Sequence, residues 1–494
     1  RRKYEHVDTP PRRHLPPPRP CASSLAVPVN RIQSRHRQAT AAVNALLLLA
    51  SACSPSPRVR PASSSRTGTG TTHSARAGRG PHRAGVQSVA HAPLRLGVVG
   101  ARRIPPPEPV NSTVHSSLAM PGDGGAAGRA MWVCAVLAAL PFLAAAEAAG
   151  RYRAVFNFGD SLVDAGNLVT EGIPDYLATA RLPYGQTYFG YPTGRCSDGR
   201  LVVDFIAQEF GLPLPPPSKA KNASFAQGAN FAITGATALD TDFFQKRGLG
   251  KTVWNSGSLF TQIQWLRDLK PSLCSSAQEC KEFFAKCLFI VGEFGGNDYN
   301  APLFAGKDLK EAYKLMPHVI QGISDGVEQL IAEGAKDLIV PGVMPSGCFP
   351  VYLTMYTDPK EGHGSRTGCL KRFNTFSWVH NAMLKRALEK LREKHPGVRI
   401  IYGDYFTPII QFILQPKKFG FYKQPPRACC GAPGRGPYNF NLTAKCGEPG
   451  ASACADPKTH WSWDGIHLTE AAYRHIARGW LHGPFGDQPI VQSS

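Results

Sequence analysis

Acidic residues are scarce in the first quarter of the 494-residue chain. Residues 1–119 hold three of them, Glu5, Asp8 and Glu108, against 18 lysines and arginines, so this segment carries most of the formal net charge of +21. Its apolar residues do not recur at the regular spacing of a helix or a strand, and it is rich in Pro, Ser, Ala, Gly and Arg. Such a segment buries too little apolar surface to offset the entropy lost on ordering it. We therefore expect residues 1–119 to be a disordered, low-complexity basic segment outside the mature protein.

A large basic excess is missing from the rest of the chain. From Gly150 onward, 37 basic residues stand against 30 acidic ones. A nucleic-acid-binding domain concentrates basic residues on its folded surface, because phosphate contacts dominate its affinity. The charge distribution therefore argues against nucleic acid as a partner.

Long hydrophobic runs are also missing. Residues 131–143 form an apolar stretch shorter than the about 20 residues that a membrane-spanning helix needs. The stretch follows Met120, the first methionine, and Arg129, and it precedes an Ala-x-Ala motif at Ala146 and Ala148. This order is typical of a secretory signal peptide. We expect residues 120–149 to be that signal peptide, and a secreted mature chain without a transmembrane segment.

The first 119 residues leave one alternative open. Their wealth of Arg and Ser and their shortage of acids are also typical of an organelle transit peptide. In that case the destination is an organelle rather than the extracellular space.

The ten cysteines from Gly150 onward lack the repeated C-x-x-C spacing of zinc sites. We predict no metal site and expect oxidised pairs, which fit a secreted protein. Two pairs are close enough in sequence for short loops, Cys274 with Cys280 and Cys348 with Cys369. Further bridges are expected among the four cysteines from Cys429 to Cys454. Cys287 lies in an apolar run and is expected to be a buried free thiol.

Two acceptor sequences for N-glycosylation lie in the mature region. They are Asn222-Ala223-Ser224 and Asn441-Leu442-Thr443, which make Asn222 and Asn441 predicted glycosylation sites. Sequences of this form often arise by chance, so they add little to the secretory interpretation by themselves.

Strand-like and helix-like stretches alternate through residues 150–494. The expected strands are apolar without polar alternation, as in a buried parallel sheet, and they lie at 154–158, 288–292, 338–340 and 398–402. Helical periods lie between them at 201–210, 260–269, 316–333, 372–394 and 469–480. The alternation predicts one α/β domain, a three-layer α/β/α sandwich with a mostly parallel sheet. In such a sheet ligands bind outside the carboxyl ends of the strands.

Candidate catalytic residues lie in four short segments, 158–161, 226–230, 295–299 and 463–467. The last segment holds Asp464 and His467. Ser161 offers a hydroxyl nucleophile just past a predicted strand end. His467 can serve as its base, and Asp464, three residues earlier on one turn, can hold the imidazole in the right tautomer. His460 and His475 are nearby, but neither has an acid at that spacing followed by a helix start.

Two more of these segments supply hydrogen-bond donors. Gly228 and Asn297 can donate to the oxyanion that forms on an ester carbonyl. Each residue also has an ordinary structural explanation. Ser161 fits a helix N-cap, Gly228 a turn glycine and Asn297 an Asn-Asp turn. The conjunction of all four segments in this order favours the catalytic interpretation.

The same segments resemble the plant-type branch of the GDSL esterases and lipases, in the SGNH hydrolase superfamily. Gly159-Asp160-Ser161 resembles the first block, Gly228 the second, Gly295-x-Asn297-Asp298 the third and Asp464-x-x-His467 the last. The resemblance extends from about Tyr152 to Trp480. It implies a flavodoxin-like sandwich, a Ser161, Asp464 and His467 triad, and an oxyanion hole of the Ser161 amide, Gly228 and Asn297. It also implies a location in the apoplast or cell wall.

A competing motif, G-x-S-x-G, occurs at Gly322 to Gly326. In α/β-hydrolases it forms a sharp turn after a strand, with the serine as nucleophile. Here apolar residues run through it at helical spacing, from Val319 to Ile331. The pattern therefore predicts that Ser324 is a solvent-facing helix residue.

Together the residues and the resemblance predict a secreted serine esterase or lipase that needs no metal or cofactor. Two alternatives remain: an acyltransferase that passes the acyl group from Ser161 to a sugar or lipid hydroxyl, and a binding protein without turnover. The expected partner is a small-molecule or polysaccharide ester. The sequence does not specify which ester it is, and it leaves the oligomeric state open.

Overall fold

The computed structural model describes residues 150–253, 255, 257–358, 362–422, 426–434 and 436–491. The predictions for residues 1–119 and for a signal peptide at 120–149 lie outside these residues. No helix within the described part is long and apolar enough to cross a membrane.

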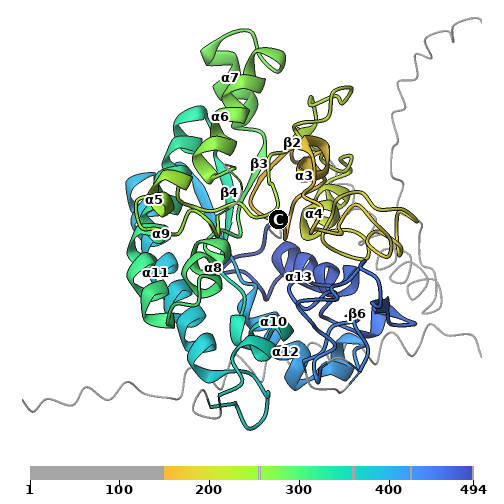
Figure 1. Cartoon of the computed structure of the whole chain (residues 1–494). Helices are drawn as coiled ribbons and strands as arrows, with labels where there is room; N and C mark the ends of the chain where they lie inside the picture. The colour runs from red at the N-terminus through yellow and green to blue at the C-terminus, as the bar shows by residue number, and fades with distance from the viewer. Residues whose placement is uncertain are drawn as a thin grey trace, which may run out of the picture. The chain divides into compact units, whose positions relative to one another are not determined.

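A parallel sheet lies at the centre of the fold, with its five strands in the order β2-β1-β3-β4-β5 (Figure 1). The strands are β1 (Val155–Phe158), β2 (Gly228–Asn230), β3 (Leu288–Val291), β4 (Asp337–Pro341) and β5 (Arg399–Gly403). In the register, Val155 pairs with Gly228 on one side and with Leu288 on the other. This is the strand order of a flavodoxin-like sheet, whose ligand crevice lies at the switch point between β1 and β3.

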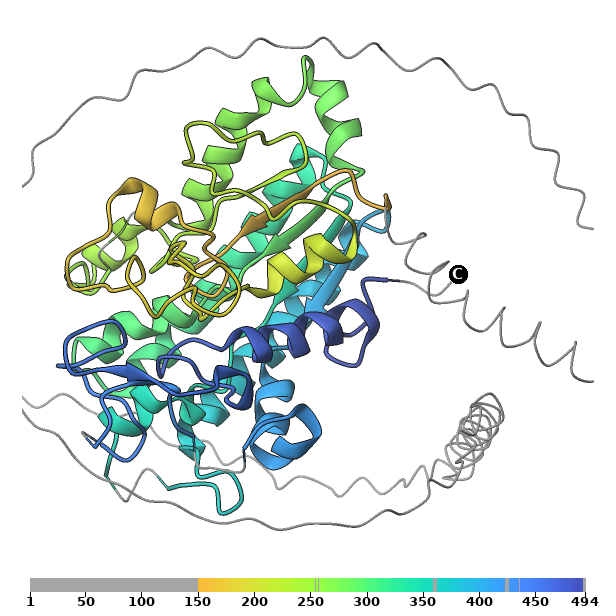
Figure 2. The same ribbon diagram turned by 90° about the vertical axis from the view of Figure 1, so that its right-hand side faces the viewer.

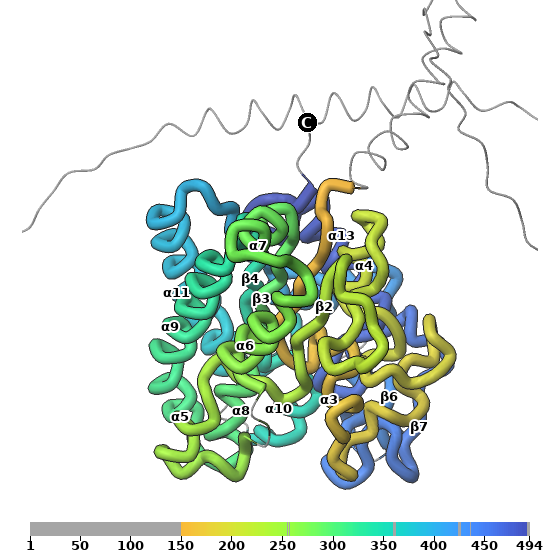
Figure 3. The backbone as a smooth tube through the Cα atoms, turned by 90° about the horizontal axis from the view of Figure 1, so that it is seen from above, coloured from red at the N-terminus to blue at the C-terminus, as the bar shows by residue number. Residues whose placement is uncertain are grey.

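Helices cover both faces of the sheet, as the view from above shows (Figure 3). Alternate strand residues point to opposite faces, so Phe156 and Phe289 pack on one side and Val155 and Ile290 on the other. The first face packs against α6 (Leu259–Leu269), α7 (Ala277–Phe284), α9 (Leu309–Glu333) and α11 (Lys371–Lys394). The second packs against α4 (Val202–Glu209), α12 (Phe406–Leu414) and α13 (Glu470–His482). In Figure 2, α4 and α13 lie in front of the sheet. The predicted three-layer α/β/α fold is confirmed.

Shorter elements fill the connections. They are α3 (Asn167–Glu171), α5 (Thr241–Gln245), α8 (Gly296–Phe304), α10 (Pro350–Met355), β6 (Cys430–Gly431) and β7 (Ser452–Ala453). Short 3₁₀ turns in the described part of the chain also lie in these connections: η1 (Lys270–Ser272), η2 (Ser346–Cys348), η4 (Pro416–Phe419) and η5 (Pro457–Thr459). The sequence analysis predicted none of these elements, and it also missed β2, α7 and α12.

The five predicted long helices and four predicted strands all exist, with one boundary clearly displaced. The helix expected to begin near Met316 is α9, which begins at Leu309 and contains Pro317. The side chain of Asp308 accepts the N–H of Lys310 over 2.8 Å, and this cap sets the earlier start. Gly334, in the left-handed conformation, ends the helix.

The G-x-S-x-G motif lies inside α9 rather than in a turn, as predicted. Ser324 is partly buried rather than solvent-facing as expected. Its hydroxyl donates to the carbonyl of Ile320 one turn earlier, over 2.9 Å. A Cβ added at Gly326 would lie 2.3 Å from Leu259 of α6. The glycine therefore permits close helix packing, and no strand or turn presents Ser324 as a nucleophile.

Four disulfides join cysteines of the described chain. Cys274–Cys280 and Cys348–Cys369 are the two short-loop pairs expected from the sequence. The four cysteines near the C-terminus pair as Cys429–Cys454 and Cys430–Cys446. Cys287 is a buried free thiol, as predicted, and Cys196 is a second.

Candidate functional site

Ser161 lies in the turn that leaves the carboxyl end of β1. The side chain of Gln262 holds this turn from α6: its oxygen accepts the N–H of Gly159 over 2.9 Å and its nitrogen donates to the Gly159 carbonyl over 2.8 Å. The first helix after the serine, α3, begins at Asn167. Ser161 is therefore not a helix N-cap, and its side chain is available for another role.

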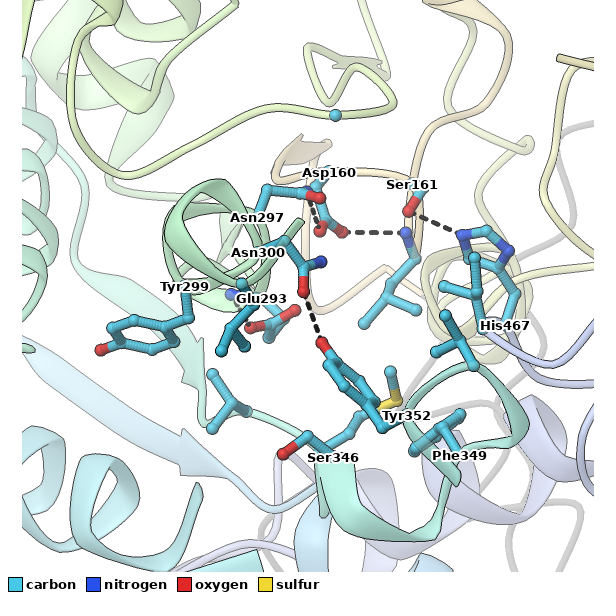
Figure 4. Close-up of a pocket in the computed structure, with 18 of the residues that line it drawn as sticks. Asp160, Ser161, Glu293, Asn297, Tyr299, Asn300, Ser346, Phe349, Tyr352 and His467 are labelled. Carbon is cyan, nitrogen blue, oxygen red and sulfur yellow. Dashed lines mark hydrogen bonds between the residues drawn. The ribbon is translucent and has the colours of Figure 1, made fainter. Parts of the chain in front are cut away.

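Asp464 and His467 share one tight turn before α13. Oδ1 of Asp464 accepts the backbone N–H groups of Ile466 (3.0 Å) and His467 (2.8 Å), while Oδ2 lies 2.7 Å from Nδ1 of the His467 ring. The spacing of three residues brings the carboxylate and the imidazole together, as the sequence predicted. Nε2 of the same ring lies 2.8 Å from the hydroxyl oxygen of Ser161 (Figure 4).

Neither competing histidine approaches the serine. His460 Nδ1 lies 3.0 Å from the hydroxyl oxygen of Thr459. His475 Nε2 lies 3.0 Å from the carbonyl oxygen of Phe419.

Asn297 is the second residue of α8, just past the end of β3. Its Nδ2 donates to Oδ2 of Asp160 over 2.7 Å and to the carbonyl of Ala236 over 3.0 Å. Because Asp160 precedes Ser161, this amide lies beside the serine at the switch point of the sheet. The predicted meeting of Asn297 and Ser161 is therefore seen in the structure (Figure 4).

Gly228 lies at the wrong end of the sheet, so its prediction as an oxyanion donor is wrong. It begins β2 and pairs with Val155 at the amino end of β1, whereas Ser161 follows the carboxyl end. Its N–H already donates to the carbonyl of Phe225 over 3.0 Å. With φ at +126° and the Val155 carbonyl 2.1 Å from where a Cβ would be, the position requires glycine for structural reasons.

Gly235, seven residues later, occupies the place that the prediction gave to Gly228. It lies past the end of β2 and lines the same cavity as Ser161 and Asn297. Within the described residues, the backbone N–H groups of Ser161 and Gly235 have no hydrogen-bond acceptor. Strand direction could have identified Gly235 from the sequence, because parallel strands carry functional loops at their carboxyl ends.

Two buried aspartates fix the loop that carries Gly235. Asp164 accepts the N–H (2.9 Å) and the hydroxyl (3.0 Å) of Thr234, which ties this loop to the Ser161 turn. Asp298 accepts the N–H groups of Ala238 (2.9 Å) and Leu239 (3.1 Å), which ties it to α8. These motif residues thus set the relative positions of the three donor segments.

The ionisation of the Asp464 and His467 pair suits a general base. Burial by itself would raise the pKa of Asp464, but the charge of His467 and the hydrogen bonds from that residue lower it to about 2. Burial would likewise lower the pKa of His467, and the Asp464 carboxylate outweighs it and raises that pKa well above its usual value. Asp464 is therefore ionised and strengthens the basicity of the imidazole.

Two further buried acids lie next to the serine. Burial raises the pKa of Asp160 to about 6. Burial, and then the charge of Asp160, raise the pKa of Glu293 well above its usual range. The two carboxyl groups thus disfavour ionising together. The sequence pattern gave no sign of this pair, because burial is what shifts both pKa values.

A cavity of about 240 Å³ extends from Ser161 and His467 between α8, α10 and α11. Most of its lining is apolar: Leu303, Phe304, Val343, Met344, Phe349, Tyr352, Phe373, Phe376 and Ile466. The polar groups on its wall include Glu293 and Asn300, whose Oδ1 accepts the Tyr352 hydroxyl over 2.5 Å (Figure 4). The cavity can take an apolar group of moderate size with its carbonyl beside Ser161.

One cluster in the described chain has the geometry of a metal site, formed by Cys429, Cys454 and His460. Its two sulfur atoms are joined in a disulfide. They therefore offer no thiolates, which a soft metal ion needs as ligands.

The serine, imidazole and carboxylate stand in one hydrogen-bonded line at the carboxyl edge of the sheet, an arrangement that belongs to the serine hydrolases. Comparison with known families identifies the family within this class. The family model described as GDSL-like lipase/acylhydrolase matches residues 155–480. The chain belongs to this family and is a carboxylic ester hydrolase.

Individual relatives agree with the family. Two GDSL esterase/lipases of Arabidopsis thaliana are 49% and 45% identical to this chain, over 68% and 69% of it and 91% and 87% of their own lengths. A sinapine esterase of Brassica napus is 43% identical over 68% of this chain and 86% of its own length. The similarity thus spans nearly the whole of each relative.

Proposed function

We propose that the chain hydrolyses esters through an acyl-enzyme formed on Ser161, with His467 as general base and Asp464 as its carboxylate partner. The observation that carries this proposal is the continuous line from Asp464 Oδ2 to His467 Nδ1 (2.7 Å) and from His467 Nε2 to Ser161 Oγ (2.8 Å). Asp464 is ionised, so Nδ1 bears the proton and Nε2 is free to accept one from the serine.

In the first half-reaction, Oγ of Ser161 attacks the ester carbonyl carbon while its proton passes to Nε2 of His467. The tetrahedral intermediate collapses as the bond to the alcohol oxygen breaks, and Nε2 returns the proton to the leaving alcohol. In the second half-reaction, water attacks the acyl-serine and gives its proton to Nε2. Ser161 then leaves with that proton, and the free acid is released.

The negative charge on the tetrahedral oxygen needs donors, and three are at hand. We assign them as the N–H groups of Ser161 and Gly235 and the side-chain amide of Asn297. All three residues line one cavity, and the two backbone N–H groups have no acceptor among the described residues. Gly235 replaces Gly228 in this assignment. Fixed donors of this kind stabilise the transition state at little reorganisation cost.

The apolar lining of the cavity favours substrates with an apolar acyl group. Its aromatic residues, Phe349, Phe373 and Phe376 among them, favour acyl groups with an aromatic ring or a chain of medium length. The similarity to a relative named sinapine esterase makes sinapine a substrate to test first. Lipid esters and acetylated wall polysaccharide are the other substrates to compare.

Secretion and glycosylation belong to the same proposal. Four disulfides in the described chain are typical of an oxidising compartment. Asn222 is exposed and Asn441 partly exposed, as glycosylation requires. Terminal sequencing and intact-mass measurement of the secreted protein test both points: we expect the mature chain to begin near Ala149 or Gly150 and to carry glycans at these asparagines.

Burst kinetics test the proposed reaction. With a series of p-nitrophenyl esters of increasing acyl size, we expect rapid release of one p-nitrophenol per active site and then slower turnover. Adding an alcohol acceptor separates hydrolysis from acyl transfer: a hydrolase yields mainly free acid, and an acyltransferase yields mainly the new ester. Ligand binding without a burst would favour the binding-protein alternative and contradict the proposal.

A further inference from the structure

Tyr184 touches the proposed triad from a distant part of the chain. Its hydroxyl lies 2.8 Å from Oδ2 of Asp464, the same oxygen that faces Nδ1 of His467. Burial, and then the charge of Asp464, raise the pKa of Tyr184 well above its usual value. The phenol therefore stays protonated and donates to the carboxylate, which can only accept.

With this contact, each of the two carboxylate oxygens of Asp464 has two hydrogen-bond partners. Oδ1 accepts two backbone N–H groups from its own turn, and Oδ2 accepts Tyr184 and His467. The turn fixes one oxygen by local geometry. Among the described residues, Tyr184 is the second partner, besides His467, of the oxygen that orients the imidazole.

Tyr184 is held in place independently of Asp464. Its ring stands edge-on to Trp463, with 6.0 Å between centroids. The following residue, Gly185, donates its N–H to the carbonyl of Ser197 over 2.9 Å. Asp198, next along that segment, accepts the N–H of Glu470 over 2.7 Å at the start of α13. The tyrosine is thus anchored to the helix that begins just after His467.

We infer that Tyr184 is a positioning residue for hydrolysis, which holds the Asp464 carboxylate at the angle that aligns His467 with Ser161. This inference rests on the proposed function. Tyr184 touches neither the substrate cavity nor Ser161, so it acts only through Asp464. Its removal should reduce kcat and leave KM nearly unchanged.

The pH dependence gives a second signature. The titratable groups near the imidazole are Asp464, Cys196 and Asp160, and those near Asp464 on the other side are Tyr184 and Tyr473. The phenol dipole withdraws part of the charge on Oδ2. Without it, the full carboxylate charge acts on the imidazolium and raises the pKa of His467 further. The acid limb of kcat/KM should then move to higher pH.

Tyr184→Phe tests this inference, because it removes one oxygen atom and keeps the ring. We expect kcat to fall about ten-fold, KM to change less than about two-fold, and the acid limb to move to higher pH. Tyr188→Phe is the matched control from the same segment, because its hydroxyl lies 3.4 Å from Gln208 at the surface and touches no part of the site. It should behave as wild type. Rates are expressed per site labelled by a fluorophosphonate, so that a smaller folded fraction does not count as lost kcat.

A double-mutant cycle with Asp464→Asn separates positioning from packing. If Tyr184 acts through the carboxylate, Tyr184→Phe costs nothing further in the Asp464→Asn background. An equal ten-fold loss in both backgrounds, or wild-type kcat and pH profile in Tyr184→Phe, would overturn the inference and leave the proposed function standing. Wild-type kcat in Asp464→Asn alone would overturn the proposed triad itself.

Discussion

The side-chain amide of Asn297 donates to the carboxylate of Asp160 over 2.7 Å, across 137 positions of sequence. Its second N–H donates to the carbonyl of Ala236. Both hydrogens of a proposed oxyanion donor are thus already engaged, and a developing oxyanion has to take over one of them. The two contacts fix the amide in the cavity lining that it shares with Ser161.

Asn297→Ala should therefore lower kcat by about 10²–10³-fold with little change in KM, because the donor acts mainly in the transition state. Steady-state kinetics on one p-nitrophenyl ester measure both constants. A loss confined to KM would show that Asn297 binds the ground state instead.

Substituting Gly235 should affect catalysis, whereas substituting Gly228 should affect stability. Gly235→Ala should lower kcat in a folded protein, because the new methyl group and the positive φ of +87° disturb the N–H proposed to face the oxyanion. Gly228→Ala should lower the unfolding temperature, because its Cβ would meet the Val155 carbonyl at 2.1 Å. Thermal unfolding and kcat per labelled site separate the two effects. A folded Gly228→Ala protein with specifically reduced kcat would restore Gly228 to the site.

Ser161→Ala should abolish labelling by a fluorophosphonate probe and reduce turnover to the small activity left by binding and the oxyanion donors. Ser324→Ala should keep both, because its hydroxyl lies within α9 and donates to the helix carbonyl of Ile320. Gel fluorescence after labelling is the readout, with circular dichroism to verify folding. Labelling of a folded Ser161→Ala protein would refute the assignment.

The pH profile follows from the state of His467. The imidazole must be neutral to accept the Ser161 proton, and the Asp464 carboxylate raises its pKa well above the usual value. Activity is therefore present above the raised pKa and lost as pH falls through it. We expect the acid limb of kcat/KM to lie above the ordinary histidine pKa of about 6.5. Initial rates from about pH 5 to about pH 9 test this, and a limb well below 6.5 would contradict it.

The disulfide Cys430–Cys446 should support the catalytic turn. Cys430 donates its N–H to the carbonyl of Trp463 over 2.6 Å, next to Asp464. Replacing both cysteines by serine should destabilise the protein by about 2–4 kcal/mol and also lower kcat as the turn loosens. Thermal unfolding and steady-state kinetics measure the two losses.

The pair Cys274–Cys280 provides the control for that experiment. It closes a loop with a sequence separation of 6, against 16 for Cys430–Cys446. It joins Cys280 of α7 to the segment before that helix, outside the cavity lining. Its replacement should cost less stability and leave kcat unchanged. Equal effects on kcat from both pairs would argue against a specific role for Cys430–Cys446.

Several features were determined by the sequence alone because each is a local pattern. Apolar runs without alternation predicted the buried strands β1, β3, β4 and β5 and so the parallel sheet. Strand ends then indicated where Ser161 and Asn297 would lie. The spacing of Asp464 and His467 was enough to place the carboxylate and the imidazole together, because residues three positions apart lie on the same turn.

Other features were decided only by the tertiary structure, because they depend on which distant segments pack together. The direction and register of the three-residue strand β2 put Gly235, not Gly228, beside Ser161. The contact of Tyr184 with Asp464 spans 280 positions, and no sequence period encodes it. The raised pKa values of Asp160 and Glu293 arise from burial, which exists only once the layers close around the sheet.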